Sequence, residues 1–125
     1  MTSESRTMHI GELAERTGLS LRTLRHYDEV GLVRASGRTE GGFRVYTESD
    51  YDRLVLIRRM KPLGFTLEEM ADLLQIVDGE STARAERGNL SSFIDRAVQR
   101  RDELRKQVAM ADEFIELLKS RQAHS

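Results

Sequence analysis

The sequence predicts a mainly α-helical protein, in which a small helical head carries a two-stranded β wing and one long helix follows. Three observations predict this class. Capping and stop signals mark short helices between residues 10 and 78, the pattern becomes β-like from Leu32 to Tyr46, and apolar residues recur in heptads from Leu90 to Leu118. The 125 residues suffice for one modest core plus an extension.

The first two predicted helices are joined by a tight turn. Apolar residues on one helical face precede Gly18, which provides the usual left-handed stop. Ser20 can then cap a second helix that runs to about Glu29. Two short helices at this spacing match a helix-turn-helix, and the arginines of the second helix and the wing behind it strengthen that interpretation.

The wing and two further helices complete the predicted head. Between residues 32 and 46, short apolar segments flank a polar, glycine-rich stretch, which indicates two strands. Thr47 can cap a third helix, which Pro62 ends. Thr66 and Glu69 then form a capping box, which is the clearest helix start in the chain.

A coiled-coil seam follows the head. Its apolar positions are spaced alternately four and three residues apart, with one interruption at Arg101. Because the rest of the chain is too short to cover this stripe, we expect a second copy to do so. The predicted dimerisation residues are Leu90, Ile94, Ala97, Leu104, Val108, Ala111, Ile115 and Leu118. The chain thus divides into a head at 1–78, a linker at 79–89 and a coiled-coil helix with a short tail at 90–125.

Composition excludes several classes of protein. The chain has no cysteine, so it has no disulfide, thiolate metal site or cysteine nucleophile. It has no apolar stretch near the roughly 18 residues of a membrane span, and we expect a soluble cytoplasmic protein without a membrane partner. The net charge of −1 conceals an uneven distribution, because residues 16–44 hold six arginines against three acidic residues. An anionic partner is therefore compatible with this composition.

The segment Gly18–Leu32 (GLSLRTLRHYDEVGL) resembles the recognition segment of MerR-family transcriptional regulators. The resemblance extends through GFRVY at 42–46, through residues 54–59 and through LGFTLEE at 63–69, in the order and at nearly the spacing of that family. It implies a winged helix-turn-helix DNA-binding head and an antiparallel coiled coil for dimerisation. It also implies binding to an inverted repeat in double-stranded promoter DNA, which the dimer bends and untwists for RNA polymerase.

The resemblance also implies which residues meet DNA, some on the second helix and others on or near the wings. They are Ser20, Arg22, Arg25, Tyr27, Phe43, Arg44, Tyr46 and Lys61. Arginine supports this assignment independently, since its planar donor fork suits guanine edges and phosphate oxygens. Alternatives stay open for four positions. Arg22 and Arg25 also fit a solvated helix face, Tyr27 fits the core as well as DNA, and Phe43 equally fits packing under the wing.

Other chemistry is poorly supported. The three histidines are scattered, no nucleophile or phosphate-loop motif is present, and we expect no enzyme, no cofactor, no metal site and no metal effector. A small-molecule effector, if there is one, would bind between the fourth helix and the coiled coil, at Met70, Leu74, Val77 and Phe93, under a lid formed by the linker. The sequence does not identify that effector.

The favoured function is a promoter-binding transcriptional regulator located at the nucleoid. One alternative is a ligand-independent DNA-architectural protein or simple repressor, which would share the head but lack a switch. An alternative of another class is a coiled-coil interaction module whose basic helix is incidental.

Overall fold

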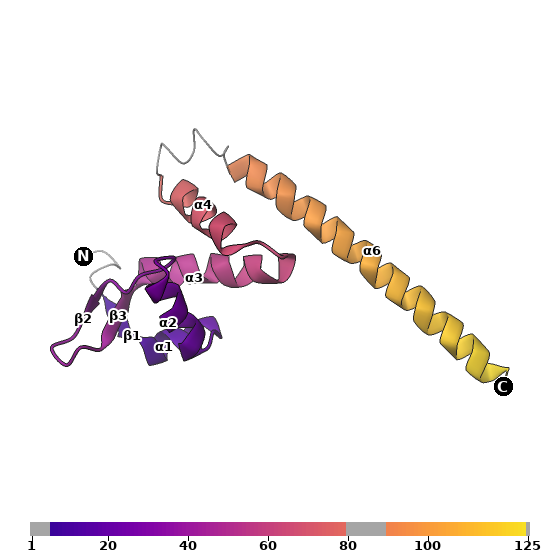
Figure 1. Cartoon of the computed structure of the whole chain (residues 1–125), viewed down its shortest axis with the longest axis horizontal. Helices are drawn as coiled ribbons and strands as arrows, with labels where there is room; N and C mark the ends of the chain where they lie inside the picture. Colours follow the sequence, from indigo (N-terminus) through magenta and orange to yellow (C-terminus); the bar gives the residue numbers. More distant parts are fainter. Residues whose placement is uncertain (1–5, 80–89, 125) are drawn as a thin grey trace.

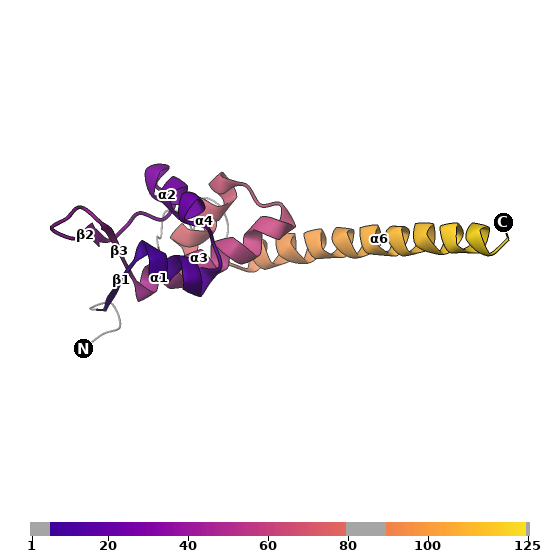
Figure 2. The same cartoon turned by 90° about the horizontal axis from the view of Figure 1, so that it is seen from below.

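The computed structural model describes residues 6–79 and 90–124, so most of the predicted linker lies outside the described residues. A compact head is followed by one long helix that extends away from it (Figures 1 and 2). The elements in chain order are β1 (Thr7–His9), α1 (Ile10–Thr17), α2 (Leu21–Glu29), β2 (Gly37–Arg38), β3 (Arg44–Thr47), α3 (Glu48–Met60), the 3₁₀ helix η2 (Lys61–Leu63), α4 (Leu67–Val77) and α6 (Leu90–Ala123).

The predicted helix-turn-helix is formed by α1 and α2. Gly18 has a φ of 75°, a left-handed conformation that glycine adopts without strain, and its N–H bonds the Ala14 carbonyl. The Ser20 side chain accepts a hydrogen bond from the Thr23 backbone N–H, which confirms the predicted cap. Leu24 of α2 is buried in the shared core, so this short helix is held by packing as well as by its cap.

The sheet differs from the predicted two-stranded wing because it has a third strand. Its order is β1-β3-β2, all antiparallel, and Met8 of β1 pairs with Tyr46 of β3. The strand β1 has three residues, of which only Met8 is buried. So short a segment shows no alternating pattern, and it becomes a strand only because the exposed edge of β3 offers it hydrogen bonds.

Capping boxes start both α3 and α4. Thr47 and Asp50 cap α3 reciprocally, as Thr66 and Glu69 cap α4, in agreement with the predicted starts. Pro62 lies inside η2, which continues from α3 as a tighter turn before the left-handed Gly64. The core of the head collects apolar side chains from every helix and from β3, and the largest fully buried ones are Tyr46, Leu13, Leu24, Leu54 and Ile57.

The long helix α6 contacts the head only through its first turns. Phe93 is buried there, with its ring centroid 6.2 Å from that of Phe65. Arg100 adds an ion pair with Glu69 at 3.1 Å and lies over the Phe65 ring. From residue 101 to residue 124, every described residue is exposed. Among the described helices, none is long and apolar enough to cross a membrane.

Candidate nucleic-acid interface

The outer face of α2 presents unpaired cations. Arg22 and Arg25 are exposed, and within the described part of the chain neither guanidinium has an ion pair or hydrogen bond. Ser20 is also exposed, but its hydroxyl already makes two hydrogen bonds to Thr23. It donates to the Thr23 hydroxyl at 2.9 Å and accepts from the Thr23 backbone N–H, which is the helix cap. This face can therefore offer arginine donors to an external acceptor without first breaking a bond inside the protein.

Two predicted DNA contacts lie in the core instead. Tyr27 is 4% exposed and Tyr46 is 1% exposed, and burial raises the pKa of both phenols. For Tyr27 the core alternative is the correct one, since its helical face is shared with Leu24. Tyr46 projects from β3 into the core of the head, where it is among the largest fully buried side chains. We therefore leave both tyrosines out of the candidate interface.

Arg44 was expected to meet the phosphate backbone, but its side chain is occupied. Its Nε donates a 2.8 Å hydrogen bond to Oδ2 of Asp28 near the end of α2, and both side chains are largely shielded from water. The other carboxylate oxygen of Asp28 accepts from the Ala35 backbone N–H. Burial acts to raise the pKa of Asp28, but these two hydrogen bonds outweigh it and hold that pKa below its ordinary value. Arg44 thus fastens the wing to the recognition helix.

The exposed tip of the wing carries Phe43 and Arg38. Phe43 is 67% exposed, so it does not pack under the wing. Arg38 is exposed on β2 and donates to the Gly42 carbonyl, which closes the turn. Sequence reasoning missed Arg38, although it belongs to the arginine-rich stretch, because it falls in the polar segment predicted to connect the two strands. The tip therefore combines an aromatic face with a cation.

A second basic surface lies at the end of α3. Arg58, Arg59 and Lys61 are all exposed, and no described residue forms an ion pair with them. The guanidinium of Arg58 lies over the α1–α2 turn, where Nη2 would be 3.1 Å from a Cβ built on Gly18. Arg58 and Gly18 are 40 positions apart, so no sequence pattern indicated that this cation lies beside the turn that precedes α2.

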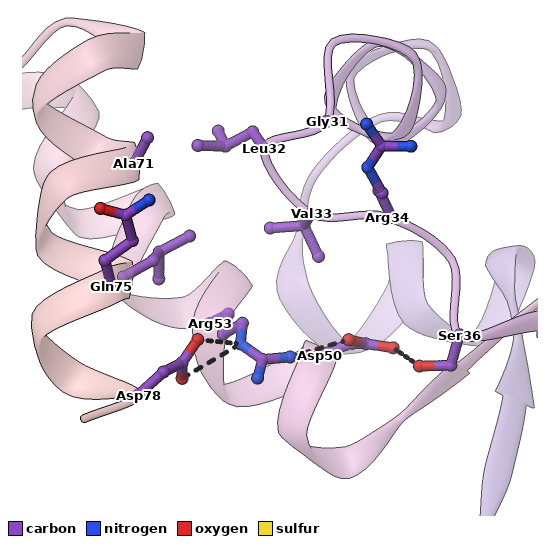
Figure 3. A pocket seen from close by; sticks show the side chains of 11 residues that line it. Gly31, Leu32, Val33, Arg34, Ser36, Asp50, Arg53, Ala71, Gln75 and Asp78 are labelled. Carbon is purple, nitrogen blue, oxygen red and sulfur yellow. Dashed lines mark hydrogen bonds and ion pairs between the residues drawn. The ribbon is translucent and has the colours of Figure 1, made fainter. Parts of the chain in front are cut away.

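Other arginines of the head serve structural ion pairs. Arg16 makes a two-pronged pair with Glu48 at 2.8 and 3.1 Å and lies over the Tyr51 ring. Arg53 joins Asp50 to Asp78 and thereby links the start of α3 to the residue after α4. Figure 3 shows this bridge on one side of a cleft of about 350 Å³ between α4 and the loop after α2. All carboxylates drawn there already hold hydrogen bonds from protein groups.

A cavity does lie between the head and the start of α6, where the effector pocket is predicted, but the expected residues of α4 do not line it. Met70 and Leu74 are buried in the core, and Val77 is 48% exposed. Of the four predicted residues, only Phe93 lines the cavity between head and α6, because the helical face of α4 turned toward α6 carries Leu73. That cavity, termed the apolar groove, measures about 210 Å³ and is lined by Leu56, Arg59, Met60, Leu63, Phe65, Leu73, Leu90, Phe93, Ile94 and Ala97.

Within residues 6–79 and 90–124, no three histidine or acidic side chains gather as a metal site would require.

Comparison with known proteins agrees with a helix-turn-helix head that carries a basic face. Residues 8–76 match the family model of the MerR HTH family regulatory protein, and residues 51–121 match the model described as MerR, DNA binding. The mercuric resistance operon regulatory protein of Bacillus cereus is 48% identical over 69 residues, which cover 55% of this chain and 52% of that protein. The HTH-type transcriptional regulator HmrR of Rhizobium leguminosarum bv. viciae is 35% identical over 103 residues, 79% of each chain.

A solved structure extends the likeness to α6. HiNmlR, a MerR family regulator lacking the sensor domain and bound to promoter DNA, superposes with a TM-score of 0.64 at 28% identity, over 94% of this chain and 89% of that one. The match spans about half the length of two curated relatives, 52% of the mercuric resistance regulator and 47% of the nodulation protein NolA of Bradyrhizobium sp. (strain NC92). With two family models covering the head and the long helix, the chain belongs to the MerR family of helix-turn-helix, DNA-binding transcriptional regulators.

Proposed function

We propose that the protein regulates transcription by binding an inverted-repeat promoter as a homodimer, with α2 of each protomer in the major groove of one half-site. The observation that carries this proposal is the contrast among the arginines. Arg16, Arg44 and Arg53 are held by carboxylates, whereas Arg22 and Arg25 project from α2 without a partner among the described residues. An α-helix fits the major groove of DNA, and guanidinium groups that have no partner inside the protein can donate hydrogen bonds to the edges of guanine bases there.

The surfaces on either side of α2 supply contacts to the sugar-phosphate backbone. Phe43 and Arg38 at the wing tip take one side, and Lys61 with Arg58 takes the other. Contacts of this kind position a protein on DNA and add affinity for every sequence, because phosphates are the same at each base pair.

The exposed seam of α6 supports a homodimer. Leu104, Val108, Ile115 and Leu118 are each at least 40% exposed, a stripe that a single chain leaves in water. The distribution of charged residues along α6 favours antiparallel pairing of the two helices. Residues 90–106 hold five basic and three acidic side chains, whereas residues 107–118 hold three acidic and no basic ones. Antiparallel pairing sets the basic half of one helix against the acidic half of the other.

Such a dimer fixes the distance and angle between its two recognition helices. A promoter whose half-sites do not match that geometry must bend and untwist to bind, at a cost of several kcal/mol that phosphate contacts at both ends offset. The distortion brings the promoter elements into register for RNA polymerase. The structure of a relative bound to promoter DNA supports promoter DNA as the partner, and the protein would act at the nucleoid in the cytoplasm.

The direct test is footprinting on the DNA upstream of the gene for this protein, followed by transcription from that promoter with purified polymerase. We expect two protected half-sites related by a two-fold axis, with enhanced cleavage between them where the duplex is distorted. Arg22→Ala should abolish the protection at the same concentration. Arg121→Ala, which removes the same charge from the far end of α6, should leave it intact. Equal protection of unrelated DNA would exclude a sequence-specific regulator.

A further inference from the structure

The C-terminal half of α6 carries a second apolar row beside the dimerisation seam. Met110, Phe114 and Leu117 are spaced four and three residues apart, and each is at least 60% exposed. They lie next to Ala111, Ile115 and Leu118 of the seam, so the apolar face is wider here than a pair of helices needs. Something other than the partner's helix must cover this additional row.

Heptad geometry indicates which way the row faces. Phe114 follows Phe93 by three heptads, and positions a whole number of heptads apart share one face of a coiled coil. Phe93 packs on its own head, with its ring near Phe65. In an antiparallel pair the two-fold axis is perpendicular to both helices, so both heads lie on the same side of the coil. Phe114 therefore faces the side on which the other protomer's head lies.

The apolar groove lies at the same level along the coiled coil as Phe114 of the other protomer. An antiparallel register centred on Leu104 sets Leu90 opposite Leu118 and Ile94 opposite Phe114. Both Leu90 and Ile94 line the groove, which is continuous with the seam and almost wholly apolar. Its exposed rim includes Arg59, a cation without a partner among the described residues, while the turn around Phe114 carries Glu113 and Glu116. The level of the groove along the coil, its apolar lining and the charge of its rim thus all fit the turn around Phe114 of the other protomer.

We propose that the apolar groove is a socket for Phe114 of the partner subunit, flanked by the partner's Leu117, so that each head is clamped between its own α6 and that of the other protomer. This inference rests on the proposed homodimer. It adds that the coiled coil does more than join the chains, because it fixes the orientation of each head. The angle between the two recognition helices then depends on two symmetric sockets as well as on the seam.

Cross-linking tests the arrangement cleanly, since the natural chain has no cysteine. The full-length double variant Leu63→Cys/Phe114→Cys should form a disulfide-linked dimer when oxidised with copper phenanthroline. Phe114→Cys alone should not, because the two copies of position 114 would be about 30 Å apart along the coil, 20 residues at 1.5 Å each. Leu104→Cys, at the centre, should cross-link to its own copy.

The outcomes separate the socket from the dimer itself. If Leu104→Cys cross-links but Leu63→Cys/Phe114→Cys does not, the dimer stands and the socket is overturned, and the groove is then open to another occupant such as a small apolar molecule. Efficient cross-linking of Phe114→Cys to itself would show parallel helices and overturn the socket. Failure of every pair, with a monomer in sedimentation, would remove both the dimer and the socket.

A second measurement does not depend on disulfide geometry. Phe114→Glu should raise the dimer dissociation constant by at least about tenfold, since each dimer would lose two buried aromatic rings. Lys106→Gln changes the net charge by the same amount at a position opposite the seam of α6 and should leave the constant unchanged. A dimer as tight in Phe114→Glu as in the natural chain would contradict the socket.

Discussion

Asp28 in the last turn of α2 accepts a 2.8 Å hydrogen bond from Nε of Arg44 in the central strand of the wing. The pair joins the two parts of the head that we propose to contact DNA, the recognition helix and the wing. The same carboxylate also holds the Ala35 backbone N–H, so it fixes both ends of the connection between helix and wing. An arginine that sequence similarity places at the phosphate backbone therefore serves first to position the wing.

Asp28→Asn should loosen the wing. The amide can no longer form the charge-assisted pair but keeps a neutral acceptor, so we expect the free energy of unfolding to fall by about 1–2 kcal/mol. Operator affinity should fall as well, because the wing would no longer be pre-positioned. Denaturant melts and binding isotherms measure both. Glu29→Gln removes the same charge from an exposed neighbour and serves as the control. If the two variants behave alike, the pair does not fasten the wing.

Stability should depend on pH in the acidic range. Hydrogen bonds from Arg16 lower the pKa of Glu48, and the Thr66 backbone N–H, with help from Arg100, lowers that of Glu69. Asp28 has a lowered pKa as well. Because the unfolded chain binds protons more readily at these carboxylates, their stabilisation is complete above an ordinary carboxyl pKa of about 4 and is lost as pH falls through the lowered values. The melting temperature should be level from pH 7 to about 5 and then drop below about 4.

Glu69→Gln provides the check on that assignment. The variant keeps an oxygen acceptor for the Thr66 backbone N–H but has no proton to gain, so its melting temperature should fall less steeply between pH 5 and 3 than that of the natural chain. An identical slope would mean that Glu69 does not contribute to the acid sensitivity.

Arg22→Ala should change sequence preference as well as affinity. A bidentate arginine contact with a guanine is worth about 1–3 kcal/mol of discrimination, so the variant should relax specificity at one base pair in each half-site. Lys61→Ala should instead weaken operator and random DNA by the same factor, because phosphates carry no sequence. Binding to a library of single-base operator variants distinguishes the two. Equal loss for Arg22→Ala on operator and random DNA would assign that residue to the backbone.

Tyr46→Phe should leave both folding and DNA binding intact. The Tyr46 hydroxyl is buried and finds no hydrogen-bond partner among the described residues, so removing it relieves a desolvated polar group instead of breaking a bond. We expect unfolding free energy equal to or above that of the natural chain. Weaker operator binding with unchanged stability would show that this hydroxyl does reach DNA.

Leu104→Glu should produce monomers. Leu104 lies at the centre of the predicted antiparallel seam and is 40% exposed in the single chain, so a dimer would bury one carboxylate against its own copy. Sedimentation equilibrium should show the monomer at micromolar concentration, with much weaker operator binding. Gln99→Glu adds the same charge away from the seam and should remain dimeric. A dimeric Leu104→Glu protein would place the interface elsewhere.

The sequence by itself determined where the helices lie, which residues cap them, and that α6 carries a heptad repeat of apolar residues. A cap such as Ser20 or the pair Thr66 and Glu69 acts within one turn, and a heptad repeat is a property of one helix, so both can be seen in neighbouring residues. The arginines of α2 were found in the same way, because their exposure follows from helical periodicity.

Tertiary structure alone decided what depends on residues far apart in the chain. Met8 becomes part of a strand only beside Tyr46, and Arg44 is held inward only by its ion pair with Asp28. Arg58 reaches the α1–α2 turn at Gly18 only in the folded chain. The apolar groove likewise forms where α3, η2, α4 and α6 converge. Local pattern sets which side chains face outward, but whether an outward arginine is free for DNA depends on a partner that only folding brings near.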